Sequence, residues 1–205
     1  MDSKNQTAAM GILLTISAAH FLNDLLQSVI PASFPVLKEA NALTFAEVGL
    51  ITLTVQITSS HLQPFVGAVS DRHPMPEALP CGMLLSGLGL ILLAHAATLP
   101  AILISVALIG CGSAVFHPES SRTAQDVSGG RRGFAQAVFQ VGGNAGSAMG
   151  PIAAALVVIP YGQSSIGWFS LSAALAFLLL VGVAKTYHRA PPEAVKSAAA
   201  ASGSG

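Results

Sequence analysis

The sequence predicts an all-α membrane protein with six transmembrane helices, and three observations predict it. Of its 205 residues, 52% are hydrophobic and only 9% are charged. A soluble domain carries roughly a quarter charged residues, so this chain has too few to cover a water-exposed surface. The apolar residues also gather in long runs, and a helix that crosses a bilayer needs about 20 of them. The lipid bilayer is therefore the expected surroundings of this chain.

Six runs have the length of a membrane span. They cover residues 9–37, 45–70, 77–98, 99–126, 133–160 and 164–187. Pro31 and Pro35 predict the end of the first run, because proline cannot continue the hydrogen-bond pattern of a helix. Thr44 followed by Glu47 is a capping-box pattern that predicts a helix start. Residues 160–162 read Pro-Tyr-Gly, a turn signal between the last two runs.

The two ends of the chain lie outside the predicted bundle of residues 9–187. Residues 1–8 form a polar N-terminal tail without the basic region and cleavage site of a signal peptide. Residues 188–205 combine Pro-Pro with low-complexity Ala, Ser and Gly, which predicts a disordered tail or linker. The last residues are typical of either an engineered junction or a natural disordered tail.

The basic residues predict the orientation of the bundle. Six spans place both termini on one side of the membrane, and eight of the nine Lys and Arg residues fall on that side. These eight are Lys4, Arg72, Arg122, Arg131, Arg132, Lys185, Arg189 and Lys196. Because basic residues accumulate on the cytoplasmic side, we expect both termini in the cytoplasm, with the chain in the inner membrane of the cell. The formal net charge is zero, which argues against a nucleic-acid partner.

Polar side chains recur along three of the predicted spans, where exposure to lipid costs several kcal/mol each. They are Ser17, His20, Asn23, Asp24 and Gln27 in the first, Thr52, Gln56, Ser59 and Gln63 in the second, and Gln136, Gln140, Asn144 and Ser147 in the fifth. At about 1.5 Å rise per residue, His20, Gln56 and Asn144 all come near the middle of the bilayer. This common depth predicts a shared water-accessible cavity between the three spans. Hydrogen bonding between packed helices is the alternative for any single amide side chain.

The fourth span ends in a polar cluster, within the sequence AVFHPESSR at residues 114–122. His117 can gain or lose a proton near neutral pH. Glu119 in a poorly solvated site can carry a proton, and Arg122 follows within one helical turn. The cluster predicts a proton or anion relay at the mouth of the cavity. The alternative is that it only anchors the helix end at the membrane surface.

The fifth span carries a second stripe, made of small residues. Gly142, Gly146 and Gly150 recur every four residues and predict a flat face for close helix packing. Pro151 predicts a bend directly after it. Cys81 and Cys111 lie in apolar runs without a CxxC pattern or a histidine at metal-ligand spacing, so the sequence indicates neither a metal nor an organic cofactor.

Three features resemble the N-terminal half of a major facilitator superfamily transporter. Residues 67–72, GAVSDR, resemble the loop motif G-x-x-x-D-R, and residues 146–151, GSAMGP, resemble the antiporter motif G-x-x-x-G-P. The third and sixth spans are almost free of polar residues, like the peripheral helices of that family. The resemblance covers residues 9–187 and implies half of a major facilitator fold. It also implies a cytoplasmic gate, for which the candidates are Asp71, Arg72, Arg122 and Asp126.

Four stretches carry a closer resemblance within the family, to proton-coupled exporters of a small phosphonate antibiotic. They are residues 17–35, 62–76, 112–122 and 139–151. This resemblance implies an antiporter that confers antibiotic resistance by efflux, with His20, Asp24 and His117 handling substrate and protons. We add Asn23, Gln27, Gln56, Glu119, Gln140 and Asn144 as further candidates for that site.

Two departures from the family pattern qualify this expectation. The loop motif continues as residues 73–76, HPMP, without the usual basic residues of the gate. The family also has two six-helix halves, whereas this chain has one. Either the chain is a truncated or engineered half without activity, or it is a half-sized transporter that works as a homodimer.

Other classes of membrane protein fit the sequence less well. An intramembrane serine protease would pair a buried serine such as Ser113 with a histidine on a later span, and the sixth span has none. A channel would need paired Asn-Pro motifs or a carbonyl filter, and neither is present. The sequence therefore predicts a transporter and not an enzyme.

Overall fold

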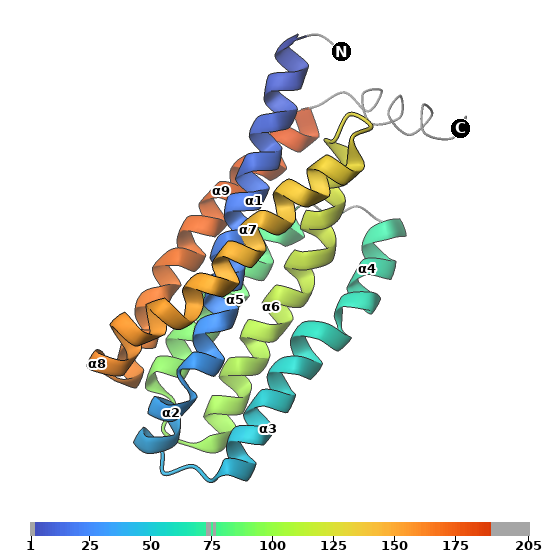
Figure 1. The fold of residues 1–205 in the computed structure, drawn as a ribbon. Helices are drawn as coiled ribbons and strands as arrows, with labels where there is room; N and C mark the ends of the chain where they lie inside the picture. Colours follow the sequence, from blue (N-terminus) through green and yellow to red (C-terminus); the bar gives the residue numbers. More distant parts are fainter. Residues whose placement is uncertain (1–2, 73–74, 76, 190–205) are drawn as a thin grey trace.

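The computed structural model describes residues 3–72, 75 and 77–189, and these residues form a bundle of long helices (Figure 1). No strand occurs among the described residues. The elements in chain order are α1 (Ser3–Ala32), α2 (Phe34–Ala40), α3 (Phe45–Gln56), the π-helix η1 (Ile57–His61), α4 (Gln63–Arg72), α5 (Ala78–His95), α6 (Leu99–Asp126), α7 (Arg132–Ala153), the π-helix η2 (Ala154–Val158), α8 (Ile159–Tyr161), the 3₁₀-helix η3 (Gln163–Phe169) and α9 (Ser170–Arg189).

The predicted all-α membrane fold is confirmed. Five helical segments within the described residues are long and apolar enough to cross a membrane. They are Ala9–Ala32, Ala78–His95, Leu99–Asp126, Arg132–Tyr161 and Gln163–Tyr187. The second predicted span is instead divided into α3, η1 and α4, which follow one another along the bundle in Figure 1. Each of these three pieces is too short to count as a span on its own.

The predicted helix ends agree with the structure in two places. Thr44 caps α3, because its side chain accepts a hydrogen bond from the Glu47 amide at 3.2 Å and Glu47 accepts one from the Thr44 amide at 2.7 Å. Gly162 forms the predicted turn with φ at +76°, a value that favours glycine. The first predicted run is two helices, since α1 ends at Ala32 and Pro35 lies in the first turn of α2.

Two π-helices interrupt the long spans. One, η1, lies in the middle of the second span, and the other, η2, begins three residues after Pro151. A π-turn accommodates one more residue than an α-turn, so the residues that follow it are rotated around the helix axis. In the fifth span, the α-helix therefore changes to a π-helix at Ala154, shortly after Pro151, the residue that predicts a bend.

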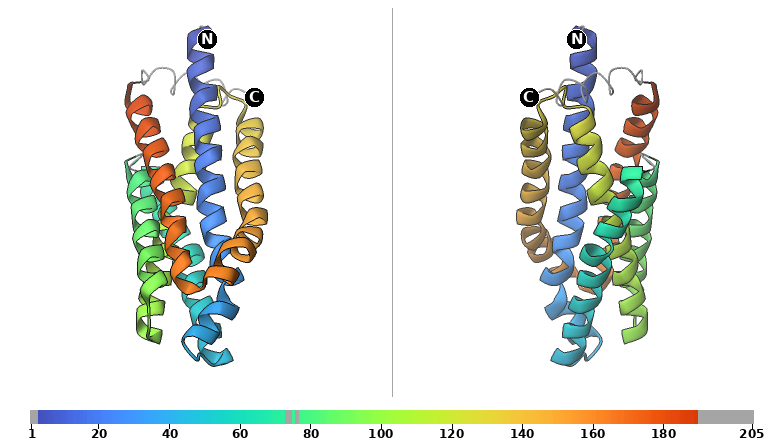
Figure 2. Two further views of the ribbon diagram at one scale, coloured as in Figure 1. Left: turned by 90° about the vertical axis from the view of Figure 1, so that its left-hand side faces the viewer. Right: turned by 90° about the vertical axis from the view of Figure 1, so that its right-hand side faces the viewer.

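The two ends of the described chain lie at the same end of the bundle, as the start of α1 and the end of α9 show in Figure 2. The helix α1 begins at Ser3, inside the predicted tail of residues 1–8, although its apolar part begins at Ala9. The helix α9 continues to Arg189. The rest of the predicted disordered tail, residues 190–205, lies outside the described residues.

The glycine stripe of α7 lies directly against α1. A Cβ atom at Gly142 would stand 2.1 Å from the carbonyl oxygen of Ser17, and one at Gly146 would stand 2.1 Å from that of Phe21. At Gly150 the nearest atom would be the Cβ of Ser28, at 2.3 Å. Because two of these neighbours are backbone atoms, the two helices cannot keep this separation with any larger residue.

This contact predicts that Gly146→Ala destabilises the bundle by about 1–3 kcal/mol, the usual cost of forcing extra atoms into a packed contact. The apparent melting temperature in detergent should fall by roughly 3–10 °C. Gly182→Ala is the matched control, because a Cβ there meets nothing within 4 Å. Equal melting temperatures for the two variants would contradict the packing role of Gly146.

Candidate functional site

A cavity of about 410 Å³ lies between α1, α4, α6 and α7, and most of the side chains around it are polar. Its lining consists of His20, Asp24, Gln63, His117, Pro118, Ser121, Gln136, Phe139, Gln140 and Asn144. The volume lies in the range of small-molecule sites, about 300–1,000 Å³. The structure thus brings five of the candidate residues around one space, namely His20, Asp24, His117, Gln140 and Asn144.

His20 and Asp24 stand one turn apart on α1, with His20 Nε2 3.3 Å from Asp24 Oδ2. The other ring nitrogen of His20, Nδ1, lies 2.9 Å from the carbonyl oxygen of Phe139 on α7. A carbonyl oxygen can only accept a hydrogen bond, so Nδ1 is the donor and carries a proton. The remaining nitrogen, Nε2, faces the carboxylate.

The packing around His20 holds the ring in this orientation. The imidazole stacks on the Phe139 ring with 3.9 Å between centroids and a 14° angle between planes. The ring also packs against Gly143 of α7, where a Cβ atom would stand 2.3 Å from the His20 ring. The ring is only 3% exposed, so it has little freedom to turn away from Asp24.

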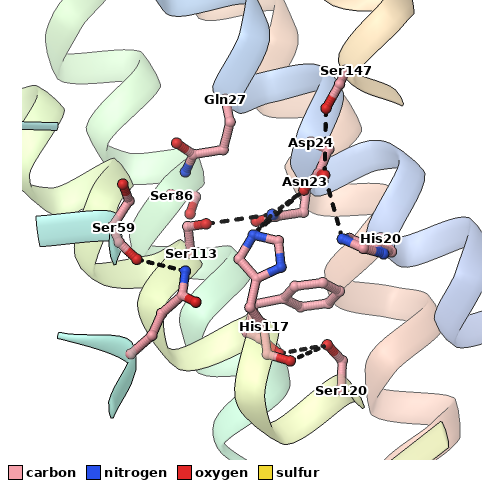
Figure 3. Close-up of polar contacts among 12 residues, drawn as sticks. His20, Asn23, Asp24, Gln27, Ser59, Ser86, Ser113, His117, Ser120 and Ser147 are labelled. Carbon is pink, nitrogen blue, oxygen red and sulfur yellow. Dashed lines mark hydrogen bonds and ion pairs between the residues drawn. The ribbon is translucent and has the colours of Figure 1, made fainter. Parts of the chain in front are cut away.

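His117 reaches the same carboxylate from α6, across the space between the helices. Its Nε2 lies 3.5 Å from Asp24 Oδ1 and 3.3 Å from Asn23 Nδ2. The rings of His20 and His117 meet edge to face with 5.1 Å between centroids. Figure 3 shows the three side chains pointing toward one another. We call His20, Asp24 and His117 the His–Asp–His cluster.

The arrangement of ring nitrogens and carboxylate oxygens in this cluster suits a shared proton. With Nδ1 of His20 donating to Phe139, a neutral His20 presents a lone pair at Nε2 to Asp24 Oδ2. Two lone pairs at that distance repel, whereas one proton between them makes a charge-assisted hydrogen bond. The geometry therefore suits a pair that shares at least one proton.

Neighbouring polar groups support the cluster from both sides. Asn23 Nδ2 donates to Asp24 Oδ1 at 3.0 Å and lies 3.5 Å from Ser113 Oγ. Ser147 Oγ of α7 lies 3.5 Å from Asp24 Oδ2. Asn23 Oδ1 is a buried polar side-chain atom for which the described residues offer no hydrogen-bond partner. Asn23 itself is 1% exposed, so it orients the carboxylate from beneath the cavity surface.

Other members of the polar stripe on α1 hold helices together. Ser17 Oγ donates to the Val138 carbonyl of α7 at 2.7 Å, and Gln27 Nε2 donates to the Ile109 carbonyl of α6 at 3.3 Å. Neither residue lines the cavity. For these two side chains the structure favours the alternative of hydrogen bonding between helices.

Gln56, another candidate residue, does not line this cavity. Its side chain is exposed and accepts a hydrogen bond from Ser60 of its own helix at 3.3 Å. The expected spacing assumed an unbroken α-helix, but η1 begins at the next residue and rotates the residues that follow it, so Gln63 does not share the face of Gln56. Gln63, after η1, is the residue of this span that lines the cavity.

Glu119 does not line this cavity either. Its carboxylate is 3% exposed and lies away from the cavity, where it accepts hydrogen bonds from the hydroxyl of Ser70 and from the Met75 amide at 3.2 Å. Arg122 also donates to the Ser70 carbonyl. Glu119 therefore belongs with the gate candidates, since it ties the end of α4 and the connection to α5 onto α6.

Two of the gate candidates, Arg122 and Asp126, contact each other near the end of α6. Arg122 Nε lies 4.0 Å from Asp126 Oδ2, and the same oxygen accepts a hydrogen bond from the Tyr187 hydroxyl at 2.9 Å. These contacts join the end of α6 to the end of α9. Arg72 is exposed, whereas the side chain of Asp71 lies outside the described part of the chain.

Sequence reasoning missed several residues of the site, among them Ser70, Phe139, Gly143 and Tyr187. Phe139 acts through a backbone carbonyl, which leaves no trace in a pattern of polar side chains. Gly143 could have been noticed in the sequence, because it is an additional glycine beside Gly142 that the four-residue repeat does not explain. A glycine is needed at this position because any side chain would collide with the His20 ring.

The connection held by Glu119 yields a prediction. Glu119→Ala removes the acceptor of both the Met75 amide and the Ser70 hydroxyl. We expect the Met75 amide to exchange with deuterium at least about tenfold faster, in line with the cost of losing a hydrogen bond to a charged group. Exchange should stay unchanged in Glu39→Ala, a substitution of an exposed carboxylate at the other end of the bundle. Unchanged exchange in both variants would contradict the role given to Glu119.

Comparison with protein families gives one match that covers most of the chain. A family profile described as Major Facilitator Superfamily matches residues 16–204. The chain is 51% identical to the fosmidomycin resistance protein of Escherichia coli (strain K12) over 179 residues, which are 87% of this chain and 44% of that protein. It is 48% identical to an uncharacterized MFS-type transporter, YfnC, of Bacillus subtilis (strain 168) over 184 residues, which are 90% of this chain and 45% of that protein.

A solved structure has the same arrangement of helices. A mutant of the peptide transporter POT in complex with alafosfalin matches 87% of this chain and 38% of its own, with a TM-score of 0.69 and 19% identity. At this identity the likeness concerns the fold alone. The chain spans less than half the length of the curated relatives it matches.

Proposed function

Because the chain belongs to the Major Facilitator Superfamily, a family of multi-pass membrane transporters and not of enzymes, we propose that it is half of a proton-coupled exporter. The proposed cargo is a small anionic antibiotic such as fosmidomycin, after the name of the relative that is 51% identical. The observation that carries the proposal is the His–Asp–His cluster at the wall of a polar cavity between membrane helices.

The cluster supplies the proton-binding part of this mechanism. Asp24 stands between two imidazoles, and His20 and Asp24 share at least one proton in the geometry described above. Ionisable groups within membrane spans are costly and mark ion or proton pathways by default. Imidazole and carboxylate groups can both bind and release a proton, so the cluster can serve as the proton-binding site of the exporter.

The same cluster accounts for the binding of an anion. Neither Lys nor Arg is among the residues that line the cavity in the described part of the chain, so protonated His20 and His117 are its only cationic groups. Gln136, Gln140 and Asn144 add amide donors for the oxygen atoms of the cargo. Loss of a proton from the cluster lowers its positive charge and favours release of the anion.

The cavity needs a second bundle to close it. Gln140 and Asn144 are exposed on α7, and Val141 and Met149 beside them are exposed apolar side chains of the same helix. The two halves of this fold are parallel repeats about an axis along the membrane normal. A second copy of this chain, inserted in the same direction, satisfies that arrangement through a two-fold axis. We therefore propose a homodimer, with transport by rocking of the two bundles around the shared cavity.

The proposed orientation places both termini in the cytoplasm and the chain in the inner membrane. The C-terminal end of α4, with Arg72, and that of α6, with Arg122 and Asp126, lie toward the same end of the bundle as the start of α1 (Figure 1). In this orientation, the hydrogen bonds of Glu119 and Arg122 to Ser70 form part of the cytoplasmic gate. The second candidate function is a half without transport activity of its own, which the length relative to the curated relatives favours.

The central test of the proposal is Asp24→Asn. Because asparagine is neutral, the variant cannot hold the shared proton, and we expect proton-driven fosmidomycin transport in proteoliposomes to fall on the order of 100-fold. The amount of folded protein should be unchanged, since Asn replaces Asp with nearly the same shape. Gln56→Ala is the control, because Gln56 lies outside the cavity. Full transport by the Asp24→Asn variant would refute the role of the cluster.

The homodimer is tested by the mass of the detergent-solubilised particle after correction for bound detergent. We expect twice the chain mass of 20.8 kDa. Crosslinking between cysteines introduced at Val141 should join two chains, because this exposed residue lies on the face proposed to meet the partner. A monomer of 20.8 kDa without transport activity would support the inactive half instead.

A further inference from the structure

We propose that the His–Asp–His cluster is a binding site for a divalent transition-metal cation, and specifically for Zn²⁺. The three residues each offer one ligand atom, and these atoms lie within 4.8 Å of one another. Two imidazoles and one carboxylate are a common ligand set for Zn²⁺. The described part of the chain contains no second group of this kind.

The spacing within the cluster fits tetrahedral coordination. With metal–ligand distances of about 2.0–2.1 Å, two ligand atoms of a tetrahedral site stand about 3.3 Å apart. His20 Nε2 is 3.3 Å from Asp24 Oδ2, and His117 Nε2 is 3.5 Å from Asp24 Oδ1. Each histidine faces a different oxygen of the carboxylate, so either oxygen or both can bind the cation. A small inward movement of His117, whose side chain is 25% exposed, completes the site.

His20 is already arranged as metal-binding histidines are. Such a histidine almost always donates its other N–H to a carbonyl or carboxylate, which aims the free nitrogen at the metal. His20 Nδ1 does so toward the Phe139 carbonyl at 2.9 Å, and the ring is held by stacking on Phe139. The carboxylate is held as well, because Asn23 Nδ2 donates to Asp24 Oδ1 at 3.0 Å.

The charge of the cluster favours a cation at this point. When the cluster holds no proton, Nε2 of His20 and Nε2 of His117 each direct a lone pair at the Asp24 carboxylate, and none of the three side chains is more than 25% exposed. A Zn²⁺ ion between them replaces this repulsion by three bonds. The remaining coordination position opens toward the cavity lined by Gln140 and Asn144, where water or an anionic oxygen can occupy it.

This inference deepens the proposed function, because the metal and the transported proton would occupy the same side chains. Zn²⁺ at the cluster excludes the shared proton and therefore inhibits proton-coupled transport. Binding of the metal, however, depends only on the geometry of this chain. It is measurable on the purified protein whether or not the protein transports anything.

The first experiment titrates the purified full chain, without a histidine tag, with Co²⁺ as a spectroscopic substitute for Zn²⁺. We expect saturation at one Co²⁺ per chain, with the strong visible absorption of a tetrahedral site, and loss of that absorption when Zn²⁺ displaces Co²⁺. A spectrum that stays that of hydrated Co²⁺ throughout the titration would overturn the proposal. This measurement needs no variant, so it decides the question even if a substitution prevents folding.

The second experiment compares variants by Zn²⁺ competition with a chromophoric chelator. His117→Gln and Asp24→Asn each remove one ligand, and each should weaken Zn²⁺ binding by more than about 100-fold, since even supporting residues contribute about 10–100-fold. His61→Ala and His95→Ala are matched controls at exposed histidines outside the cluster, and their Zn²⁺ affinity should equal that of the unsubstituted chain. Equal affinity in all four variants would place the metal elsewhere and refute the proposal.

The two proposals fail in distinguishable ways. If Zn²⁺ binds as expected but the Asp24→Asn variant still exports fosmidomycin, the metal site stands and the proposed proton pathway is wrong. If Asp24→Asn abolishes transport but the unsubstituted chain neither binds Co²⁺ tetrahedrally nor is inhibited by Zn²⁺, the metal site is wrong and the transport mechanism stands.

Discussion

The arrangement of this protein depends on the direct contact between α1 and α7. At Gly142 and Gly146 the two backbones come so close that no side chain fits between them. Because the helices are so close, Nδ1 of His20 on α1 bonds directly to the Phe139 carbonyl oxygen of α7 at 2.9 Å. This bond needs no bridging water. The tautomer of His20, the lone pair that it presents to Asp24 and the shape of the cavity all follow from that contact. The glycines of α7 thus affect the site indirectly, because they set the distance between α1 and α7 at which His20 reaches the Phe139 carbonyl.

Polar groups in a membrane span must find partners, and this chain provides them in two different ways. Ser17 and Gln27 donate to carbonyl oxygens of neighbouring helices and so stabilise the bundle. His20, Asp24 and His117 satisfy one another around a space, which leaves their charge state open to change. The difference matters because a carbonyl oxygen can only accept a hydrogen bond, whereas a carboxylate or imidazole partner can also take up a proton, as the proposed function requires of the cluster.

Near the end of α6, a separate network carries a different task. Glu119 and Arg122 both contact Ser70 at the end of α4, and Tyr187 of α9 reaches Asp126. Three spans that are distant in sequence are therefore tied together beyond the cavity. A carboxylate and an arginine that serve this network cannot also serve the cavity, which explains why only the histidine of the AVFHPESSR segment belongs to the His–Asp–His cluster.

The sequence by itself determined the membrane setting, the helical class, the capping box at Thr44 and the glycine face of α7, because these depend on composition and on regular spacing along one helix. It also indicated that the first, second and fifth spans carry polar stripes and that the fourth ends in a polar cluster. Only the tertiary structure decided which of these residues meet. Gln56 does not share the face of Gln63 because a π-turn lies between them, and Glu119 lies outside the cavity because Ser70 and the Met75 amide hold its carboxylate. The meeting of His117 with Asp24 and Asn23, 94 residues apart in the latter case, results from the packing of α6 on α1, and no local pattern in the chain records such a distance.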